Sequence, residues 1–462
     1  MKTRNQMRSL AKAVNLTEGN PLVCITRFAL PLILGNIFQL LYTLADSIIV
    51  GKALGSDSLA AVGATSMVIS LVMYFIQGST TGFSIHTAQK YGAGDKKAVR
   101  ESVAVSLLLS AIFSLLLTLV FCGFSPQIMY LMKIPDNIYQ EAYEYMFIIL
   151  LGTFTTVYYN MISNILRAFG DSTTPLVYLI ISSILHIGLA ILFVLPLHMG
   201  VAGAAWATVL SQLVSAVLCL ISGIRHYEEM HLHKEDFKNF KNTALAHLRI
   251  GLPMGFQMSV MCIGQIAMQI SVNAMGSAAI AGYTAAAKVD QLCIQVDNAL
   301  GSSIATYVSQ NYGALKWQRI KDGVRISFFQ MESINAIIGI IILIWKTPMV
   351  SLFLTNPSAE ILYYANGYLT AIAPSYLLVT LIMVYRTAVQ SMDNTRAPFA
   401  ACIIELIMRS SSTLIICHIA GYVGVCLATP LAWIGASLFI VPVYFRMMKK
   451  LDSNPGLANS TV

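Results

Sequence analysis

An aspartate inside a long apolar stretch is the first residue of this chain whose chemistry asks for an explanation. Asp46 is the one charged residue of the segment LPLILGNIFQLLYTLADSIIVG, residues 30–51. As a helix, residues 26–50 would measure roughly 37 Å, which is enough to cross a hydrocarbon core of about 30 Å. A charge at that depth costs about 2.5–3.5 kcal/mol on insertion scales, so Asp46 indicates a functional site.

Polar residues share a helical face with Asp46. Steps of three and four back along the helix lead to Thr43, Gln39 and Asn36. Within the predicted span 26–50, no Lys, Arg or His lies within seven residues of the aspartate, so an ion pair would need a partner from another helix. We therefore expect this face to meet water, a bound cation or a substrate. The residues assigned to a substrate cavity in this half are Asn36, Gln39, Tyr42 and Thr43.

The second half of the chain carries further ionisable residues within apolar stretches. Asp290 and Asp297 are seven residues apart, which places them two turns apart on one helical face. Cavity-facing sites and buried structural pairs are both open for them. The residues assigned to the substrate cavity here are Gln257, Gln265, Asp290 and Asp297. Glu405 and Arg409, four residues apart, are predicted to form a membrane charge pair that lowers the insertion cost of each partner.

The composition is that of a polytopic membrane protein. The 462 residues are 56% hydrophobic and 11% charged, with a mean hydropathy of +0.70, whereas soluble domains are roughly 25% charged. Charge clusters and turn residues divide the chain into twelve predicted transmembrane helices, an all-α fold. The predicted spans are 26–50, 59–86, 102–124, 141–165, 175–195, 202–224, 249–272, 279–309, 324–346, 361–386, 398–418 and 424–445.

The net charge of +8 is explained by topology. On the predicted spans nearly all Lys and Arg residues fall on the side of the two termini, including Arg386 at the end of the tenth span. This asymmetry predicts a multi-pass protein of the inner (plasma) membrane with both termini cytoplasmic, and it argues against nucleic-acid binding. The eight cysteines form no CxxC pair, and no HExxH or GxSxG occurs, so we expect no metal site, no cofactor and no enzymatic activity.

The chain contains an internal repeat. Gln89-Lys-Tyr91-Gly92-Ala93 recurs in the second half as Gln310-Asn-Tyr312-Gly313-Ala314. Leu30-Pro31 with Leu252-Pro253, and Asp171 with Asp393, match at nearly the same separation along the chain. Because each copy holds six spans, the copies are predicted to form a parallel repeat about an axis along the membrane normal, with halves that rock around a central cavity. The predicted domains are a six-helix lobe 1–224, a cytoplasmic linker 225–248 and a second six-helix lobe 249–462.

Several of these segments together resemble one family. The segment from Pro31 to Gly55, the stretch GSTTGFSIHTAQKYGAG at 78–94, the turn RAFGDSTTP at 167–175 and the later QNYGA are similar to the multidrug and toxic compound extrusion (MATE) family over essentially the whole chain. The resemblance implies two six-helix lobes that expel organic cations or amphipathic drugs in exchange for protons or sodium ions.

The resemblance also implies positions for an ion-coupling site. Asp46 matches the first-helix aspartate that one branch of the family uses, and Asn160 matches its polar partner in the fourth span. The second aspartate of that branch is replaced by Ala190, and His186 stands where an asparagine is usual. In another branch the coupling acid is a seventh-span glutamate, where this chain has Met261. We therefore predict ion coupling at Asp46, Asn160 and His186, with H⁺ and Na⁺ both open.

Alternative functions remain within the same superfamily. A lipid-linked precursor flippase or a metabolite exporter would be built from related spans. Against a flippase stands the acidic balance of the spans, in which Asp46, Asp290, Asp297, Glu332 and Glu405 face only Lys288 and Arg409. The expected partners are small organic cations and membrane lipids, and we expect a monomer.

Overall fold

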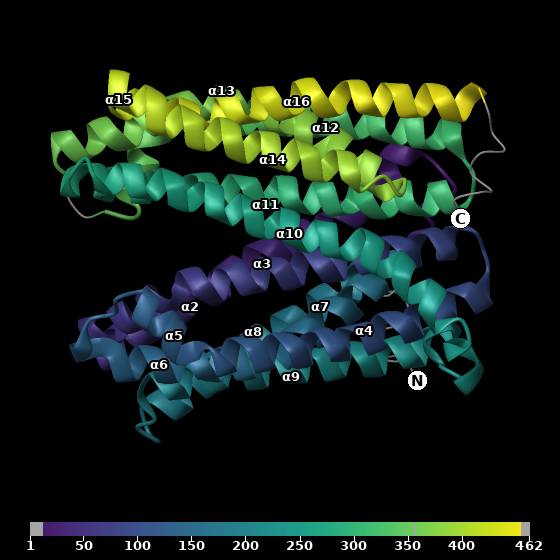
Figure 1. Ribbon diagram of the computed structural model, residues 1–462, viewed down its shortest axis with the longest axis horizontal. Coiled ribbons are helices and arrows are strands. Elements are labelled where there is room, and N and C mark those ends of the chain that lie inside the picture. The colour runs from purple at the N-terminus through teal and green to yellow at the C-terminus, as the bar shows by residue number, and fades with distance from the viewer. Residues whose placement is uncertain (1–12, 355–356, 454–462) are drawn as a thin grey trace, which may run out of the picture. The chain divides into compact units, whose positions relative to one another are not determined.

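The computed structural model describes residues 13–354 and 357–453 and shows an all-helical protein in those ranges (Figure 1). Residues 1–12 and 454–462, on which the predicted placement of both termini depends, lie outside the described residues. The elements of the first half are α2 (Pro21–Leu54), α3 (Ser56–Gly92), α4 (Lys96–Gly123), α5 (Ser125–Leu131), α6 (Asp136–Leu151), α7 (Thr153–Ala168), α8 (Thr173–Val194), α9 (Gly200–His226), η1 (Glu228–Met230) and η2 (Lys234–Phe237). Those of the second half are α10 (Phe240–Asn273), α11 (Ser277–Gly313), α12 (Trp317–Ser351), α13 (Ala359–Ser391), α14 (Arg396–Ser411), η3 (Ser412–Ile416), α15 (Cys417–Ala420) and α16 (Tyr422–Ser453).

The helices account for the twelve predicted spans, which confirms the fold class. Ten are long and apolar enough to cross a membrane, taking Arg396–Ala420 as one, and the pair α6 and α7, bent by 42°, forms an eleventh. The twelfth is α11, which is 37 residues long but carries Lys288, Asp290 and Asp297. Most helices run past the predicted span ends, because regular backbone hydrogen bonding continues where a segment leaves the hydrocarbon layer.

The described chain forms two compact units. The first contains Leu30–Phe256 with Val14, and the second contains Asn15–Ala29 with the chain from Gln257 onward. Two helices are divided between the units, α2 next to Pro31 and α10 three residues after Pro253. The units thus differ in membership from the predicted lobes 1–224 and 249–462, whose boundaries stay a prediction.

The backbone repeats as the sequence predicts. Left-handed residues recur in both halves: Gly55 with Gly276 (φ +95° and +96°), Gly94 with Leu315 (+74° and +55°), Gly170 with Asp393 (+88° and +68°), and Gly200 with Gly421 (+59° and +59°). This corrects one detail of the predicted repeat, since Asp393 corresponds to Gly170 and not to Asp171.

The residue equivalent to Asp171 is Asn394. The backbone N–H of Asp171 donates to Leu166 O, and that of Asn394 donates to Val389 O, five residues back in both cases. The Asp171 and Asn394 Oδ1 atoms each accept a hydrogen bond from the backbone N–H three residues ahead. The same shift along the chain also aligns Pro175 with Pro398.

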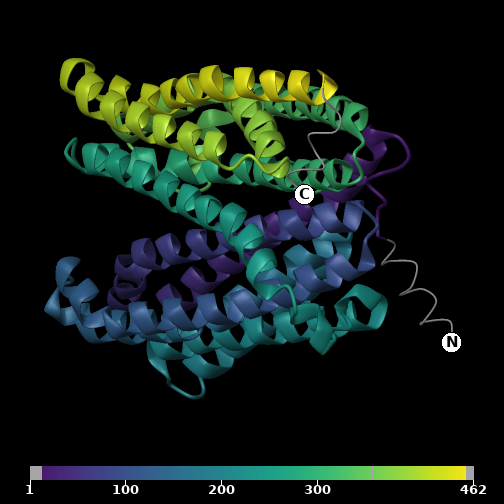
Figure 2. The ribbon, with the colours of Figure 1, turned by 45° about the vertical axis from the view of Figure 1, so that its right-hand side comes forward.

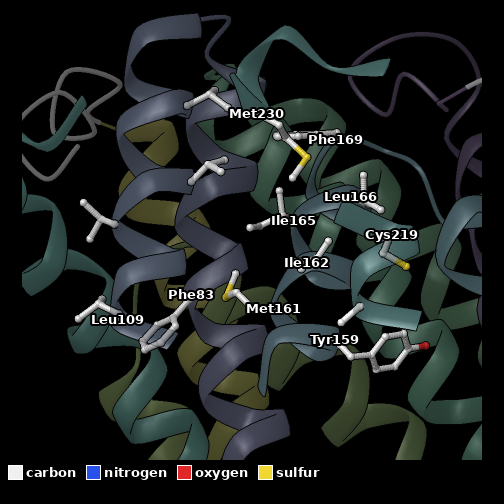
Figure 3. Close-up of a cluster of buried hydrophobic side chains, with 14 of the residues drawn as sticks. Phe83, Leu109, Tyr159, Met161, Ile162, Ile165, Leu166, Phe169, Cys219 and Met230 are labelled. Carbon is white, nitrogen blue, oxygen red and sulfur yellow. The ribbon is translucent and has the colours of Figure 1, made fainter. Parts of the chain in front are cut away.

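The linker between the halves folds onto the first unit. A buried apolar cluster joins α3, α4, α7, α9 and η1 through Phe83, Leu109, Ile165, Cys219 and Met230 (Figure 3). Polar contacts hold the same segment, since Asp236 pairs with Arg100 at 3.5 Å and Tyr227 donates to Asp171 at 3.1 Å. Burial and the Asp171 carboxylate raise the pKa of the Tyr227 phenol, so it stays a donor at physiological pH.

Each unit is a bundle of closely packed helices. In the first unit α3 and α10 meet at glycines, and a Cβ on Gly82 would lie 2.5 Å from the Cα of Gly251. In the second unit α16 packs along α13 and α14 (Figures 1 and 2). Many large apolar side chains, such as Leu119 and Ile184, remain exposed, as expected for surfaces that face lipid.

Candidate functional site

Three helices of the first unit surround Asp46. The aspartate lies on α2 and is 8% exposed. Tyr145 of α6 donates its hydroxyl to Asp46 Oδ2 at 3.4 Å, and His186 of α8 places Nε2 3.5 Å from Asp46 Oδ1. Both contacts are long for hydrogen bonds to a carboxylate, which are usually about 2.7–2.9 Å. The carboxylate is therefore buried but incompletely compensated.

His186 is held by its surroundings on α8, α9 and α2. Its side chain has no exposed surface, and its Nε2 lies 3.3 Å from the hydroxyl of Thr208 on α9. The ring of Tyr42 lies against the imidazole, with centroids 4.1 Å apart. The helices α8 and α9 pack along each other, which brings Thr208 to the histidine although the two residues are 22 positions apart in sequence.

Three polar atoms of this group have no hydrogen-bond partner among the described residues. They are Asp46 Oδ1, His186 Nδ1 and the Tyr42 hydroxyl. Buried polar atoms in native proteins are nearly always paired, so each exception calls for an explanation such as a bound ion or a labile proton. An acid, an imidazole and two phenols with spare hydrogen-bonding capacity could together bind and release a cation or a proton.

The other predicted residues of the first half lie at different places. Gln39 and Thr43 are exposed, and Asn36 is partly exposed, so the polar face of α2 is accessible. Asn160 lies on α7, where its amide donates to Thr156 O at 2.9 Å. Among the residues that the structure describes, Asn160 forms no hydrogen bond with Asp46. The structure thus brings together Asp46, His186 and Tyr42 but not Asn160.

Asp290 is well compensated by α13 in the second unit. Its two carboxylate oxygens accept hydrogen bonds from the hydroxyls of Tyr376 at 2.5 Å and Tyr368 at 3.2 Å. The guanidinium of Arg409 lies near enough to interact electrostatically with it. Asp290 therefore has the hydrogen bonds and the opposite charge that a buried carboxylate needs.

Glu405 and Arg409 form an ion pair, as their spacing predicts, at 2.7 Å. A second guanidinium joins them, because Arg386 of α13 lies 3.5 Å from the other Glu405 oxygen. Arg386 is 4% exposed, so the expectation that it belongs to the charges at the membrane surface is wrong. With Asp290, these residues make a buried group of two acids and two arginines whose formal charges cancel.

The remaining predicted residues of the second half differ in exposure. Gln265 is exposed on α10, whereas Gln257 is buried and its side-chain oxygen is unpaired. Asp297 has no exposed surface and neither of its oxygens forms a hydrogen bond. In residues 13–354 and 357–453, no three His, Cys, Asp or Glu side chains lie close enough to hold a metal ion.

Sequence reasoning did not find several residues that complete these sites. They are Tyr145, Thr208, Tyr368 and Tyr376. A signal existed for the last two, because tyrosines eight residues apart lie on one face of a helix and both present a hydroxyl. For Tyr145 and Thr208 the sequence offers no such spacing, since their partners are on other helices.

Repeated helical units whose buried polar groups lie at membrane depth define a secondary transporter. The comparisons give the family: residues 31–192 and 253–415 both match MatE, once in each half. The chain therefore belongs to the MATE family, which consists of multidrug efflux transporters and not of enzymes. The two matched segments begin at Pro31 and Pro253, as the sequence repeat predicts.

Individual relatives cover most of the chain. It is 28% identical over 372 residues to a probable multidrug resistance protein, YpnP, of Bacillus subtilis, covering 79% of this chain and 81% of the relative. It is 22% identical over 417 residues to an FAD transporter of Shewanella oneidensis, covering 88% and 90%. A solved structure of a multidrug resistance MATE transporter in an outward-facing conformation matches with a TM-score of 0.87 at 25% identity, covering 96% of this chain and 99% of the other.

Proposed function

We propose that this transporter exports organic cations or amphipathic drugs in exchange for protons, and that Asp46 and His186 form the proton-coupling pair. The observation that carries the proposal is a buried carboxylate with one unpaired oxygen, 3.5 Å from a fully buried imidazole. Carboxyl and imidazole groups are the side chains that most readily exchange protons near neutral pH. The matches to drug-resistance proteins support the substrate class.

The coupling follows from the charge of the pair. With Asp46 ionised and His186 neutral, the site carries one negative charge and attracts a cationic substrate along the accessible polar face of α2. A proton taken up by the pair cancels that charge and weakens the hold on the cation. Proton and substrate then favour opposite states of one conformational equilibrium, which is the requirement for exchange.

Each neighbour of the pair has a separate role in this scheme. The Tyr145 hydroxyl donates to the ionised carboxylate and stabilises it between protonation events. Thr208 holds the imidazole through Nε2, which leaves Nδ1 available to gain or lose a proton. Gln39 and Thr43 line the approach on α2, and Gln265 does so on α10, as neutral polar contacts for varied substrates.

The surroundings favour a proton over sodium. Sodium, like other hard cations, prefers several oxygen ligands, as magnesium and calcium do. One side of Asp46 is instead occupied by the imidazole Nε2 of His186, and the hydroxyl of Tyr145 occupies the other. Exchange of one proton for one monovalent cation would be electroneutral, so a pH gradient would supply about 1.4 kcal/mol per unit.

The setting of the transporter is part of the proposal. The basic residues of the sequence favour a plasma-membrane protein with both termini cytoplasmic. Within one chain, the groups that hold the coupling pair all come from the first unit, so we propose that a monomer transports.

A second candidate is export of an anionic metabolite such as a flavin nucleotide. The relative described as an FAD transporter supports it. Anionic substrates need unpaired cationic groups, however, and Arg386 and Arg409 are neutralised by Glu405 and Asp290. This balance favours the cation exporter.

The test is efflux of ethidium, a fluorescent organic cation, from proteoliposomes under an imposed pH gradient or an imposed sodium gradient. We expect the pH gradient to drive efflux by the wild type, and Asp46→Asn to reduce efflux to the level of empty vesicles. His186→Gln keeps a hydrogen-bonding side chain but cannot carry the proton, so its efflux should lose most of its response to the gradient. Asp57→Asn, at an exposed residue of α3, is the matched control and should behave as wild type.

Other outcomes would overturn parts of the proposal. Efflux driven by sodium alone would refute proton coupling. Efflux by Asp46→Asn at the wild-type rate would remove the coupling pair from the first unit. If neither gradient moves ethidium but the wild type transports flavin nucleotides, the second candidate replaces the first.

A further inference from the structure

A second carboxyl group in this protein has a more unusual environment than Asp46. Asp297 lies on α11 in the second unit, where α12 and α13 pack against it. Its side chain has no exposed surface, and both oxygens lack a hydrogen bond. Asp290, on the same face of the helix two turns earlier, has two tyrosine hydroxyls and a nearby arginine. Only one of the two aspartates is therefore compensated as a charged group.

The side chain beside Asp297 is the amide of Asn335 on α12. The Asn335 Nδ2 atom donates to Thr380 Oγ1 at 3.0 Å and to Tyr376 O at 3.3 Å. Its Oδ1 atom is buried and accepts no hydrogen bond. Two groups that are both acceptors thus lie next to each other with no hydrogen between them.

The orientation of the Asn335 amide is fixed by its partners. Thr380 already donates its hydroxyl hydrogen to Tyr376 O at 3.3 Å, so its oxygen serves the amide as an acceptor. Turning the amide over would place Oδ1 against the carbonyl of Tyr376 and would give up both hydrogen bonds. The unpaired Oδ1 is therefore a consequence of the surrounding network, and it cannot be removed by exchanging the amide atoms.

Every charged or titratable neighbour argues against an ionised Asp297. On its own helix, Asp290 adds negative charge and Cys293 adds no positive charge. From α12, Glu332 reaches Thr380 on the other side of the amide, and from α13 the Tyr376 hydroxyl is committed to Asp290. Among the described residues, Asp297 has no ion pair with Lys, Arg or His.

One hydrogen atom resolves this arrangement. If Asp297 is a neutral carboxylic acid, its O–H group becomes a donor and the free Asn335 Oδ1 is the acceptor next to it. A single proton would then satisfy two buried polar atoms and remove an uncompensated charge, which otherwise costs several kcal/mol.

We propose that Asp297 is a second proton-carrying group of this transporter, protonated in the conformation described here. Its proton is released to water when α11 and α12 separate enough to hydrate the carboxylate, and it is regained when they close. The O–H bond breaks heterolytically, and Asn335 Oδ1 loses its donor at the same time.

The consequence for transport rests on the proposed function. With one proton at Asp46 and His186 and another at Asp297, each cycle would exchange two protons for one monovalent organic cation. One net charge would then cross the membrane in each cycle, so both the pH gradient and the membrane potential would drive export. An exporter with the first site alone would respond to the pH gradient only.

The first experiment needs no substrate. Infrared spectra of the purified protein in detergent, recorded in H₂O and D₂O at neutral pH, report the C=O stretching band of protonated carboxyl groups. We expect the wild type and the control Asp57→Asn to show this band and Asp297→Asn to lose it. Asn335→Leu keeps the carboxyl but removes its acceptor, so the band should remain and shift to higher frequency. This second variant keeps the test decisive if Asp297→Asn does not fold.

A second experiment separates this inference from the proposed function. Charge movement on addition of ethidium, measured on proteoliposomes adsorbed to a solid-supported membrane, should be present in the wild type and lost in Asp297→Asn, while pH-driven efflux persists in that variant. A band that persists unchanged in Asp297→Asn and in Asn335→Leu would overturn the inference and leave coupling at Asp46 untouched. A band that behaves as expected in a protein that moves no ethidium would leave the inference standing and refute the drug-export proposal.

Discussion

Replacing Glu405 by glutamine should destabilise the second unit severely. Glu405 is 2% exposed and is the acceptor for two guanidinium groups, Arg409 at 2.7 Å and Arg386 at 3.5 Å. The substitution keeps the size of the side chain but changes the formal charge of the group from zero to +1, counting Asp290. It also turns an NH₂ donor toward one of two arginines that have only donors.

The magnitude follows from the burial of these residues. Removing one partner of a buried ion pair costs about 3–5 kcal/mol, because an uncompensated charge is left behind. For a unit of about 200 residues, each kcal/mol lowers the melting temperature by about 2–4 °C, so we expect a loss of roughly 6–20 °C. The matched control is Glu228→Gln, whose pair with Lys96 has side chains 65% and 80% exposed and should shift melting by no more than about 4 °C.

The assay is thermal unfolding of the purified protein in detergent, followed by intrinsic tryptophan fluorescence and by the monodisperse fraction after heating. A rescue distinguishes charge from packing: Arg386→Gln added to Glu405→Gln restores a neutral group and should recover at least half of the loss. Melting of Glu405→Gln within about 4 °C of wild type, indistinguishable from Glu228→Gln, would refute the reasoning.

Three further predictions concern single contacts, all measured as melting temperature in detergent. Gly82→Ala should cost about 1–3 kcal/mol, because its Cβ would meet the Gly251 backbone at 2.5 Å, whereas Gly63→Ala on the same helix meets nothing within 4 Å and should be neutral. Leu315→Gly should stabilise by up to about 1 kcal/mol, since a leucine at φ +55° is strained. Asp171→Ala should cost about 2–3 kcal/mol, because its carboxylate accepts two backbone and two hydroxyl hydrogen bonds.

The fold could be predicted from the sequence because it depends on properties that the residues carry locally. Apolar length determines which segments span the membrane, and a repeated pattern of glycines and prolines determines that the same unit occurs twice. The weakest span by hydropathy was α11, yet its Gln310 to Ala314 ending identified it through the repeat. The register of the repeat at one turn was misassigned, since two aspartates matched by type do not occupy equivalent backbone positions.

The sites could be predicted only in part, because they depend on contacts between helices. Asp46 was identifiable as an acid at membrane depth, and His186 by resemblance. That His186 supplies a group 3.5 Å from the carboxylate depends on how α8 packs in the first unit. Arg386 was misplaced for the same reason: at the end of a predicted span it had the pattern of a surface charge, but α13 continues to Ser391 and keeps it buried.

The repeat also explains why the two units differ chemically. The shift along the chain that aligns Pro175 with Pro398 also aligns His186 of the first unit with Arg409 of the second. Both residues face an acid of their own unit, Asp46 for His186, and Glu405 for Arg409. The histidine can gain and lose a proton near neutral pH, whereas the arginine is always charged. The equivalent position is therefore a titratable partner in one unit and a permanent one in the other.

This difference decides which acids of the second unit are free to exchange protons. A permanently charged Arg409, together with Arg386, holds Glu405 and Asp290 ionised throughout the cycle. Asp297 lies outside that ion-pair group, and the shift that aligns Gln310 with Gln89 aligns it with the apolar Ile76 of the first unit. A carboxyl without a counterpart in the other unit and without an ion partner in its own serves neither the shared fold nor the charge balance, and proton exchange is the role that its surroundings leave.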